Sequence, residues 1–175
     1  MDTLKEYDIQ FVGLKLGKHS FTYSIEDTFF EKFQYEDFQS IHCKVDLVVV
    51  KKATLIEFHF SANGLATLLC DTSNEPFEQT ITNTLDLIVK FGDTFNDEDE
   101  AILILPHAEY QINIAQYIYE TIVLAIPIKR THPGLKDGSL QSKVLDKLKE
   151  LEIKEHETTD PRWDKLNELL TSKKL

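Results

Sequence analysis

Long hydrophobic stretches are absent from this sequence of 175 residues. No run of about 18 apolar residues occurs, so we expect no membrane-spanning helix. The first six residues, Met1 to Glu6, also lack the basic start and apolar core of a secretory signal. Cysteine is scarce, and Cys43 and Cys70 lie far apart in the sequence. We therefore expect reduced thiols and a cytoplasmic location.

Basic residues are under-represented, with 19 Lys and Arg against 30 Asp and Glu, which gives a net charge of −11. A protein that binds nucleic acid without a partner usually presents a basic surface, because neutralisation of the phosphates supplies most of the affinity. The acidic balance has two interpretations. It can serve solubility alone, or it can attract a basic protein partner.

Apolar residues make up 42% of the chain, as in an ordinary folded domain. Several segments alternate between apolar and polar residues, the pattern of a strand with one buried face. We expect strands over residues 7–16, 20–23, 41–49, 56–60, 65–70, 80–91 and 102–105. We expect turns near Gly17, at Lys51-Lys52 and at Asn63-Gly64, a charged loop over 97–100 and a further loop over 132–138. Consecutive strands joined by short turns form an antiparallel meander.

Helices are expected in three places. Ser24 and Asp27 fit a capping box before a face of Phe29, Phe30 and Phe33 that we assign to the core. A second helix is expected over 112–126, ended by Pro127. In the tail, Val144, Leu145, Leu148 and Leu151 recur at helical spacing, and Asp160 and Pro161 suit the start of another helix. The sequence thus predicts an α+β fold, mostly antiparallel sheet packed with a few helices, with a core domain at 1–138 and a C-terminal helical segment at 139–175.

No enzyme signature survives inspection, so we expect a protein that is not an enzyme and needs no cofactor. Gly13 to Lys18 is one residue short of a phosphate-binding loop, and His19 stands where Ser or Thr should be. His59 lies within a strand and is expected to face solvent or a polar neighbour. Asp97 and Asp99 share one solvated loop, whereas acid–base catalysis needs carboxylates in different environments.

A zinc site is not expected either. Structural zinc sites commonly use cysteines in close pairs, and Cys43 and Cys70 have no such partner. His42 is adjacent to Cys43 and should point to the opposite face of their strand.

Three segments in order carry a family resemblance. The first is Cys70-Asp71-Thr72-Ser73-Asn74-Glu75-Pro76-Phe77. The second is the end of a helix at Leu124-Ala125-Ile126-Pro127 followed by His132-Pro133-Gly134-Leu135. The third is Asp160-Pro161-Arg162-Trp163-Asp164-Lys165-Leu166. Together, over about residues 60–170, they resemble the YceD family of large ribosomal RNA subunit accumulation proteins.

The resemblance also shows where this chain departs from the family pattern of paired cysteines. Cys70 remains from the first pair, while Ser73, His132 and Lys136 occupy positions where cysteines are expected. If those cysteines bind a metal in other members, this chain has lost that site, so no metal ligand is carried over.

The tail motif is the expected functional surface, through Asp160, Arg162 and Trp163. A purely structural role competes with this interpretation, because Asp160 can cap a helix and Trp163 can pack it. Arg162 opposes the helix dipole where it stands, which favours a functional role or a pairing with a local carboxylate.

The resemblance implies a binding factor that supports accumulation or processing of large-subunit ribosomal RNA. We expect its partner to be a ribosomal protein or a pre-ribosomal particle, with a basic ribosomal protein as the natural candidate. The alternative is direct binding to pre-ribosomal RNA through a local basic patch, to which Arg130, Lys143, Lys147 and Lys149 would contribute. A metal-dependent RNA-processing enzyme is a third hypothesis. The sequence does not decide the oligomeric state.

Overall fold

The computed structural model describes residues 4–99, 101–140 and 142–151. The chain divides into two compact units, Met1–Leu140 and Gln141–Leu175. The division at 138/139 expected from the sequence stays a prediction. Among the described residues, no helix is both long enough and apolar enough to cross a membrane. The expected helix start at Asp160 lies outside the described residues.

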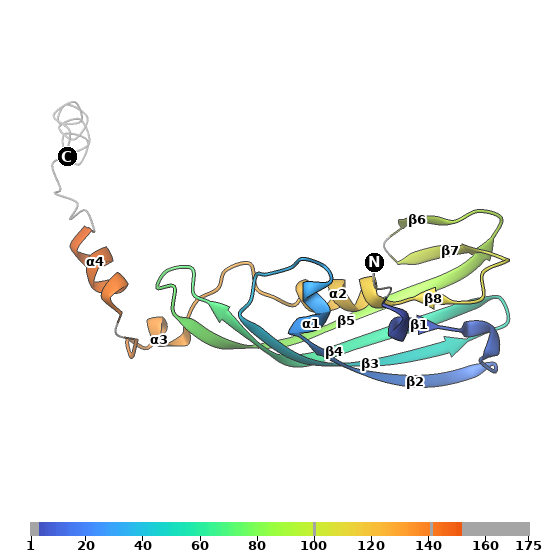
Figure 1. Cartoon of the computed structure of the whole chain (residues 1–175), viewed down its shortest axis with the longest axis horizontal. Helices are drawn as coiled ribbons and strands as arrows, with labels where there is room; N and C mark the ends of the chain where they lie inside the picture. Colours follow the sequence, from blue (N-terminus) through green and yellow to red (C-terminus); the bar gives the residue numbers. More distant parts are fainter. Residues whose placement is uncertain (1–3, 100, 141, 152–175) are drawn as a thin grey trace, which may run out of the picture. The chain divides into compact units, whose positions relative to one another are not determined.

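The first unit is built mainly of strands (Figure 1). Its strands are β1 (Asp8–Ile9), β2 (Gly17–Glu26), β3 (Ser40–Lys51), β4 (Leu55–Leu69), β5 (Pro76–Gly92), β6 (Asn96–Asp99), β7 (Ile102–Pro106) and β8 (Ile112–Asn113). Its helices are the short 3-10 turns η1 (Lys5–Tyr7) and η2 (Phe11–Gly13) together with α1 (Asp27–Glu31), α2 (Ala115–Val123) and α3 (Pro133–Lys136). Helix α4 (Lys143–Leu151) belongs to the second unit.

Six strands form the main sheet in the order β2-β3-β4-β5-β7-β6. Successive antiparallel pairs join β2 to β3, β3 to β4 and β4 to β5, as expected of a meander. The sheet then departs from the meander, because β7 pairs parallel with β5 and β6 returns antiparallel on its outer side. A separate pair, β1 with β8, ties the N-terminal segment to the start of α2. The α+β class predicted from the sequence is confirmed.

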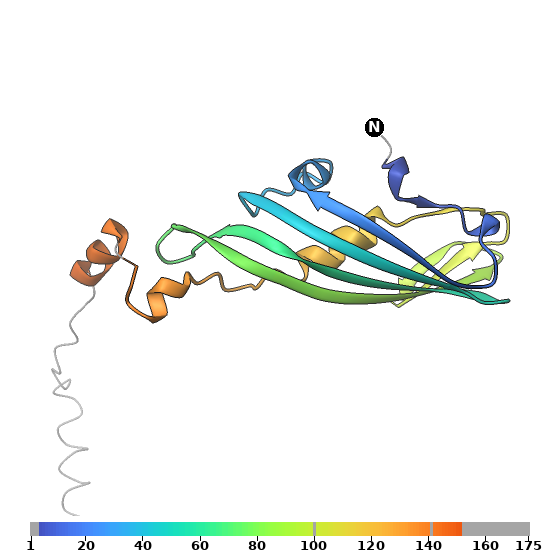
Figure 2. The same cartoon turned by 90° about the horizontal axis from the view of Figure 1, so that it is seen from below.

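One face of the sheet is buried. Along β3 the apolar residues that alternate in the sequence are all inside, from Ile41 through Val49. Helix α2 lies along β4 and β5 (Figure 2), with the Tyr117 ring 6.1 Å from that of Phe60. Helix α1 adds Phe29 and Phe30 to this core, as predicted, and Phe33 packs partly buried against it.

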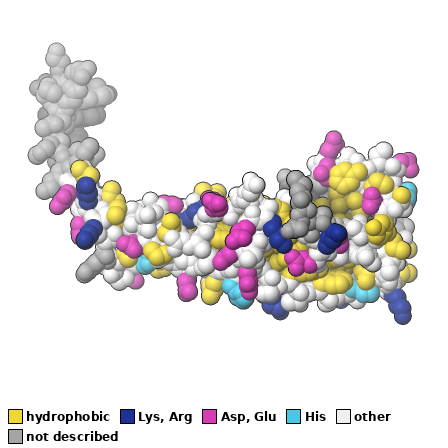
Figure 3. Space-filling view, in the orientation of Figure 1, with side chains coloured by type: hydrophobic (Ala, Val, Ile, Leu, Met, Phe, Trp, Pro, Cys, Tyr) yellow, Lys and Arg dark blue, Asp and Glu magenta, His cyan; other side chains and the backbone are white. Residues whose placement is uncertain are grey.

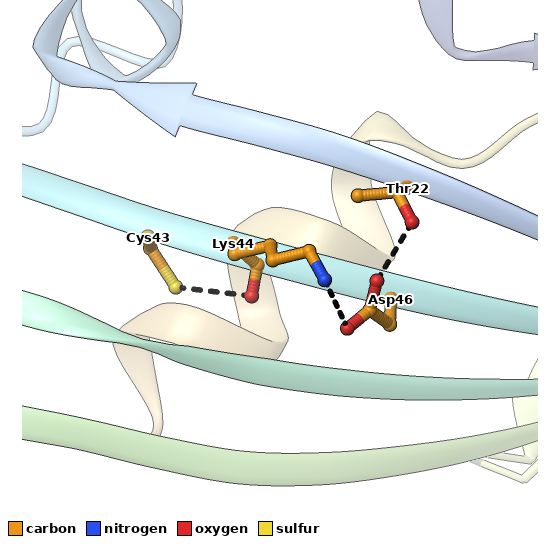
Figure 4. Close-up of polar contacts among 4 residues, drawn as sticks. All are labelled: Thr22, Cys43, Lys44 and Asp46. Atoms are coloured by element: carbon orange, nitrogen blue, oxygen red, sulfur yellow. Dashed lines mark hydrogen bonds and ion pairs between the residues drawn. The ribbon is translucent and has the colours of Figure 1, made fainter.

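The opposite face of the same strands carries polar side chains. Asp46 of β3 accepts a hydrogen bond from the Thr22 hydroxyl at 2.7 Å and one from Lys44 Nζ at 3.0 Å (Figure 4). Cys43 points the other way and is fully buried. Burial raises the pKa of its thiol to about 11, against a weaker opposing hydrogen bond from the backbone of Asn63. His42 is exposed, so the expected separation of His42 from Cys43 is confirmed.

Two predictions for the N-terminal region are wrong. Residues 7–16 do not form one strand, because only Asp8 and Ile9 pair with β8 and 3-10 turns flank them. Ser24 is not a helix cap. It lies within β2, opposite Lys44, and the Asp27 carboxylate accepts a hydrogen bond from the N–H of Ile41 at 2.6 Å instead of closing a capping box.

Asn63-Gly64 is not a turn, since β4 runs through both residues. Gly64 faces Cys43 of β3 so closely that a Cβ atom there would lie 2.3 Å from the carbonyl oxygen of His42. The glycine therefore permits a close backbone approach rather than a reversal of the chain.

Three other boundaries also differ from the prediction. Residues 96–99 form edge strand β6, where charged side chains are well tolerated, rather than a loop. The helix expected over 112–126 spans only Ala115–Val123, because residues 112 and 113 pair with β1. The loop expected over 132–138 contains the single helical turn α3.

Candidate functional site

The first two segments that carry the family resemblance meet in the fold. The N–H of Asp71 donates to the carbonyl oxygen of Arg130 at 2.9 Å, and the N–H of Arg130 donates to a carboxylate oxygen of Asp71 at 2.7 Å. Next to them, the N–H of His132 donates to Sγ of Cys70 at 3.3 Å. We call this meeting of Cys70, Asp71, Ser73, Arg130 and His132 the Cys70–His132 junction.

A tight loop between β4 and β5 presents Cys70 and Ser73. Two hydrogen bonds close the loop. The N–H of Asn74 donates to the carbonyl oxygen of Cys70 at 2.9 Å, and the N–H of Cys70 donates to the carbonyl oxygen of Glu75 at 3.0 Å. Asn74 has a φ of 57°, a left-handed conformation that asparagine tolerates better than most residues. The loop turns the Ser73 side chain inward, where the residue is only 2% exposed.

His132 holds the other side of the junction as a helix cap. Its Nδ1 accepts a hydrogen bond from the N–H of Gly134 at 2.9 Å, and Pro133 occupies the first helical position of α3. A ring nitrogen that accepts a hydrogen bond carries no proton, so the neutral ring is protonated on Nε2. The ring also lies 5.8 Å from that of Phe77. His132 therefore fixes the start of α3 against β5.

The junction makes Cys70 unusually acidic. Burial opposes ionisation of this thiol, yet hydrogen bonds from the Ser73 side chain and from the backbone N–H groups of His132, Ser73 and Thr72 outweigh it. They lower the pKa of Cys70 to about 7. Hydrogen bonds to the charged form stabilise a thiolate in the same way as they stabilise a carboxylate.

The four degenerate cysteine positions are not all in the junction. Cys70, Ser73 and His132 converge there, while Lys136 lies at the end of α3 and lines a cavity of about 640 Å³ with Lys129 and Gln79 among others. Within residues 4–99, 101–140 and 142–151, no three His, Cys, Asp or Glu side chains are grouped to hold a metal ion. Hydrogen bonds of Cys70, Asp71 and His132 join the two segments at this point.

Arg130 extends the junction to the loop that follows α1. Its guanidinium donates to the carbonyl oxygen and to a carboxylate oxygen of Asp37, both at 3.0 Å. Residues 37 and 130 are so far apart in sequence that no local pattern could have paired them, and sequence reasoning missed this contact. Arg130 was expected to contribute to a basic patch, but its charge is engaged by Asp37.

The expected basic residues of the tail lie partly within the described region. Lys143 and Lys147 are exposed on α4, one helical turn apart. Val144, Leu148 and Leu151 are also substantially exposed on this helix. The side chain of Lys149 and the whole of Asp160, Arg162 and Trp163 lie outside the described residues.

The residues considered for catalysis are placed in ordinary structural roles. Gly13 ends the turn η2 and Gly17 begins β2, so no phosphate-binding loop opens a helix there. His59 lies on β4, where its Nδ1 is 2.7 Å from a carboxylate oxygen of its cross-strand partner Asp86. This is the polar neighbour expected from the sequence.

Comparison with known proteins identifies the family and leaves the partner open. Neither the curated proteins nor the solved structures contain a match to this chain. A family model, described as large ribosomal RNA subunit accumulation protein YceD, matches residues 58–170, which include both halves of the Cys70–His132 junction. The chain therefore belongs to the YceD family of large ribosomal RNA subunit accumulation proteins.

Proposed function

We propose that this protein is a non-catalytic binding factor in large ribosomal subunit assembly, and that its direct partner is a basic ribosomal protein. The distribution of charge carries the proposal. Residues 1–140 contain 11 basic and 22 acidic side chains, whereas residues 141–175 contain eight of each. The whole excess of negative charge therefore belongs to the first unit.

This distribution favours a protein partner over RNA for the first unit. A surface with twice as many acidic as basic groups repels phosphate, so binding to RNA would gain little from the release of counterions. The same surface attracts and orients a lysine-rich protein, whose charges it would shield until that protein reaches the pre-ribosomal particle. We propose a cytoplasmic location for this activity, since the family name refers to accumulation of ribosomal RNA.

The tail favours the alternative, direct contact with pre-ribosomal RNA. It is neutral as a whole, and Lys143 and Lys147 are exposed on α4, where their side chains are available to phosphate groups. Asp160, Arg162 and Trp163 remain the candidate binding residues of the tail motif. Under this alternative the tail would contact RNA while the first unit holds the protein partner.

The full-length chain tests both hypotheses. It is purified from its native cells at physiological salt, one half is treated with nuclease, and copurifying proteins are identified by mass spectrometry. A basic large-subunit protein that stays bound after nuclease treatment supports the proposal. Loss of every ribosomal component after nuclease treatment favours RNA as the direct partner.

A cellular measurement connects the binding to the family role. Depletion of the protein should lower the amount of large-subunit ribosomal RNA relative to small-subunit ribosomal RNA. The Arg162→Ala variant should reproduce part of this loss if the tail motif is functional, while Lys165→Ala serves as a control for charge in the same segment. Metal-dependent cleavage of RNA by the purified protein would overturn a non-catalytic role.

A further inference from the structure

A large groove opens in the first unit between the β5–β7 end of the sheet and helix α2. Its volume is about 1000 Å³. The lining is mixed, and its apolar part consists mainly of leucines from both strands, which are largely buried, and of two large side chains that remain exposed. These residues are Leu85, Leu87, Leu103, Leu105, Phe95 and Leu124. Phe95 is 56% exposed and Leu124 is 72% exposed, so they offer apolar surface to a partner.

Acidic side chains surround this apolar lining. Asp97 and Asp99 come from β6, Glu120 comes from α2, and Glu109 comes from the segment between β7 and β8. Among the described residues that line the groove, none is Lys or Arg. In Figure 3 hydrophobic side chains gather over the β6–β7 end of the sheet, with acidic side chains around them.

Two further observations concern the electrostatic potential of the groove. Burial raises the pKa of Tyr117, and the charges of Glu120 and Asp97 raise it further, so carboxylates from opposite sides of the groove act on one group. Lys90 is the basic residue of β5, but it follows the buried Val89 and therefore projects from the opposite face of the sheet. The groove is thus negative and is not neutralised by this lysine.

We propose that this groove is the docking site for a segment of the basic ribosomal protein in which apolar side chains are flanked by Lys or Arg. This inference rests on the proposed function and names the surface that performs it. The apolar side chains of the segment would cover Phe95 and Leu124, and its cationic groups would reach the surrounding carboxylates. A hydrophobic centre within a charged border is the usual arrangement of a protein-binding surface.

Other occupants fit the groove less well. RNA would bring phosphates against Asp97, Asp99, Glu109 and Glu120, while the apolar lining would gain nothing from the phosphate backbone. A second copy of this chain would bring its own excess of negative charge to a negative groove. The chain's own tail, residues 141–175, contains eight basic residues and is treated as an outcome of the test.

The test uses the full-length chain with a photo-crosslinking amino acid in place of Phe95. The probe is the protein mixture extracted from purified large ribosomal subunits, freed of RNA by nuclease. A second chain with the crosslinker in place of Leu16 is the site control, because Leu16 is 68% exposed and does not line the groove. Crosslinked peptides are identified by mass spectrometry.

A second experiment compares charge-reversal substitutions inside and outside the groove. The pair Asp97→Lys and Glu109→Lys changes two exposed carboxylates of the groove, while the pair Glu36→Lys and Glu78→Lys changes two exposed carboxylates that do not line it. Both pairs raise the net charge by the same amount. We expect the two substitutions in the groove to weaken crosslinking at position 95 about ten-fold, and the two control substitutions to weaken it less than about two-fold. Equal thermal midpoints of the two variants establish that both are folded.

Each outcome decides the proposal. Lys- or Arg-rich ribosomal peptides crosslinked at position 95 but not at position 16, and lost with the groove pair, support it. Binding of a ribosomal protein that survives the groove reversals overturns the docking site and leaves the proposed function standing. Crosslinks to RNA, to a second copy or to residues 141–175 of the same chain overturn it as well. If neither chain with unchanged carboxylates, with the crosslinker at position 95 or at position 16, captures a large-subunit protein, the proposed protein partner fails together with the site.

Discussion

The Sγ atom of Cys70 accepts a hydrogen bond from the backbone N–H of His132 at 3.3 Å. The thiol and the backbone of His132 thus join the two segments, while the His132 ring caps α3 and lies against Phe77. Two neighbouring hydrogen bonds between Asp71 and Arg130 fix the same contact, one between backbone groups and one from the N–H of Arg130 to the Asp71 carboxylate. The link is therefore a polar one, and the part that Cys70 contributes depends on the protonation state of its sulfur atom.

Cys70 should make the stability of this protein depend on pH. Its pKa is about 7 in the folded chain against an ordinary value of 9.0, because hydrogen bonds from Ser73 and the backbone favour the thiolate despite burial. A group with a lowered folded-state pKa adds stability that is complete above pH 9.0 and is lost as the pH falls to about 7. As the pH increases from about 7 to 9.0, the urea midpoint of the wild type should therefore rise relative to that of Cys70→Ser.

Thiolate absorbance in the ultraviolet identifies the residue that titrates. Ser73→Ala should move the step at about pH 7 upward, because it removes a hydrogen bond to the sulfur. Cys43→Ala should leave the step in place, since burial raises the pKa of Cys43 to about 11. A step near pH 7 that persists in Cys70→Ser would contradict the assignment.

The ion pair between Arg130 and Asp37 should contribute modestly to stability. The Arg130 side chain is 22% exposed and that of Asp37 is 59% exposed, so solvent weakens the attraction. Asp37→Ala should lower the free energy of unfolding by about 1 kcal/mol or less. Arg130→Lys should lose a similar amount, because a single ammonium cannot reach both oxygens of Asp37 in the geometry of the guanidinium.

A double-mutant cycle isolates this pair. Measured by urea unfolding, Asp37→Ala and Arg130→Met together should lower the free energy of unfolding by less than the sum of their separate effects, and the difference should be smaller than either effect alone. A matched control is the exposed pair of Lys44 and Asp46, which involves no loop distant in sequence. Zero coupling between residues 37 and 130 would show that the contact does not hold the loop.

Alternation of apolar and polar residues was enough to predict the central strands and the class of fold. The apolar residues from Ile41 to Val49 form the buried face of β3. Because β3 is paired on both sides, its successive side chains can point only to one face of the sheet or to the other. The same reasoning failed at Asn63-Gly64. A glycine that ends a strand and one that lets two backbones approach have the same local sequence, and only the strand opposite distinguishes them.

The candidate site was predictable only in part. The family resemblance singled out Cys70, Ser73 and His132, and the fold brings these three together. Arg130 and Asp37 meet through the pairing of distant segments, which no local periodicity encodes. The groove was missed for a related reason. Asp97 and Asp99 were recognised within a charged loop, but the rest of the groove joins them only after β7 pairs parallel with β5.

Replacement of Phe30 by alanine should destabilise the fold more than most single substitutions in α1. Phe30 is 1% exposed and its ring lies 4.8 Å from that of Phe38 in an edge-on contact. Phe30→Ala should lower the free energy of unfolding by about 3–5 kcal/mol, because it leaves a cavity in a packed aromatic cluster. Phe33→Ala is the comparison within the same segment, and it should cost less because Phe33 is only partly buried. Urea unfolding of the two variants measures the difference, and equal losses would contradict it.

Gly64→Ala tests the close approach of β3 and β4. The added Cβ would lie 2.3 Å from the carbonyl oxygen of His42 and 2.5 Å from Cα of Cys43, and both are backbone atoms that cannot move aside alone. We expect a loss of about 1–3 kcal/mol or more in the free energy of unfolding. Gly13→Ala is the matched control, because no atom lies within 4 Å of the position of its Cβ.

The control should be nearly neutral or slightly stabilising, since alanine restricts the unfolded chain more than glycine does. The contrast between the two variants therefore separates crowding from the general effect of replacing glycine. If Gly64→Ala instead resembled Gly13→Ala in its urea midpoint, β4 would have to bend away from β3 at this point. That result would show that the two backbones at Gly64 and Cys43 can separate far enough to admit a methyl group at little cost, so the close approach would not be what requires glycine here.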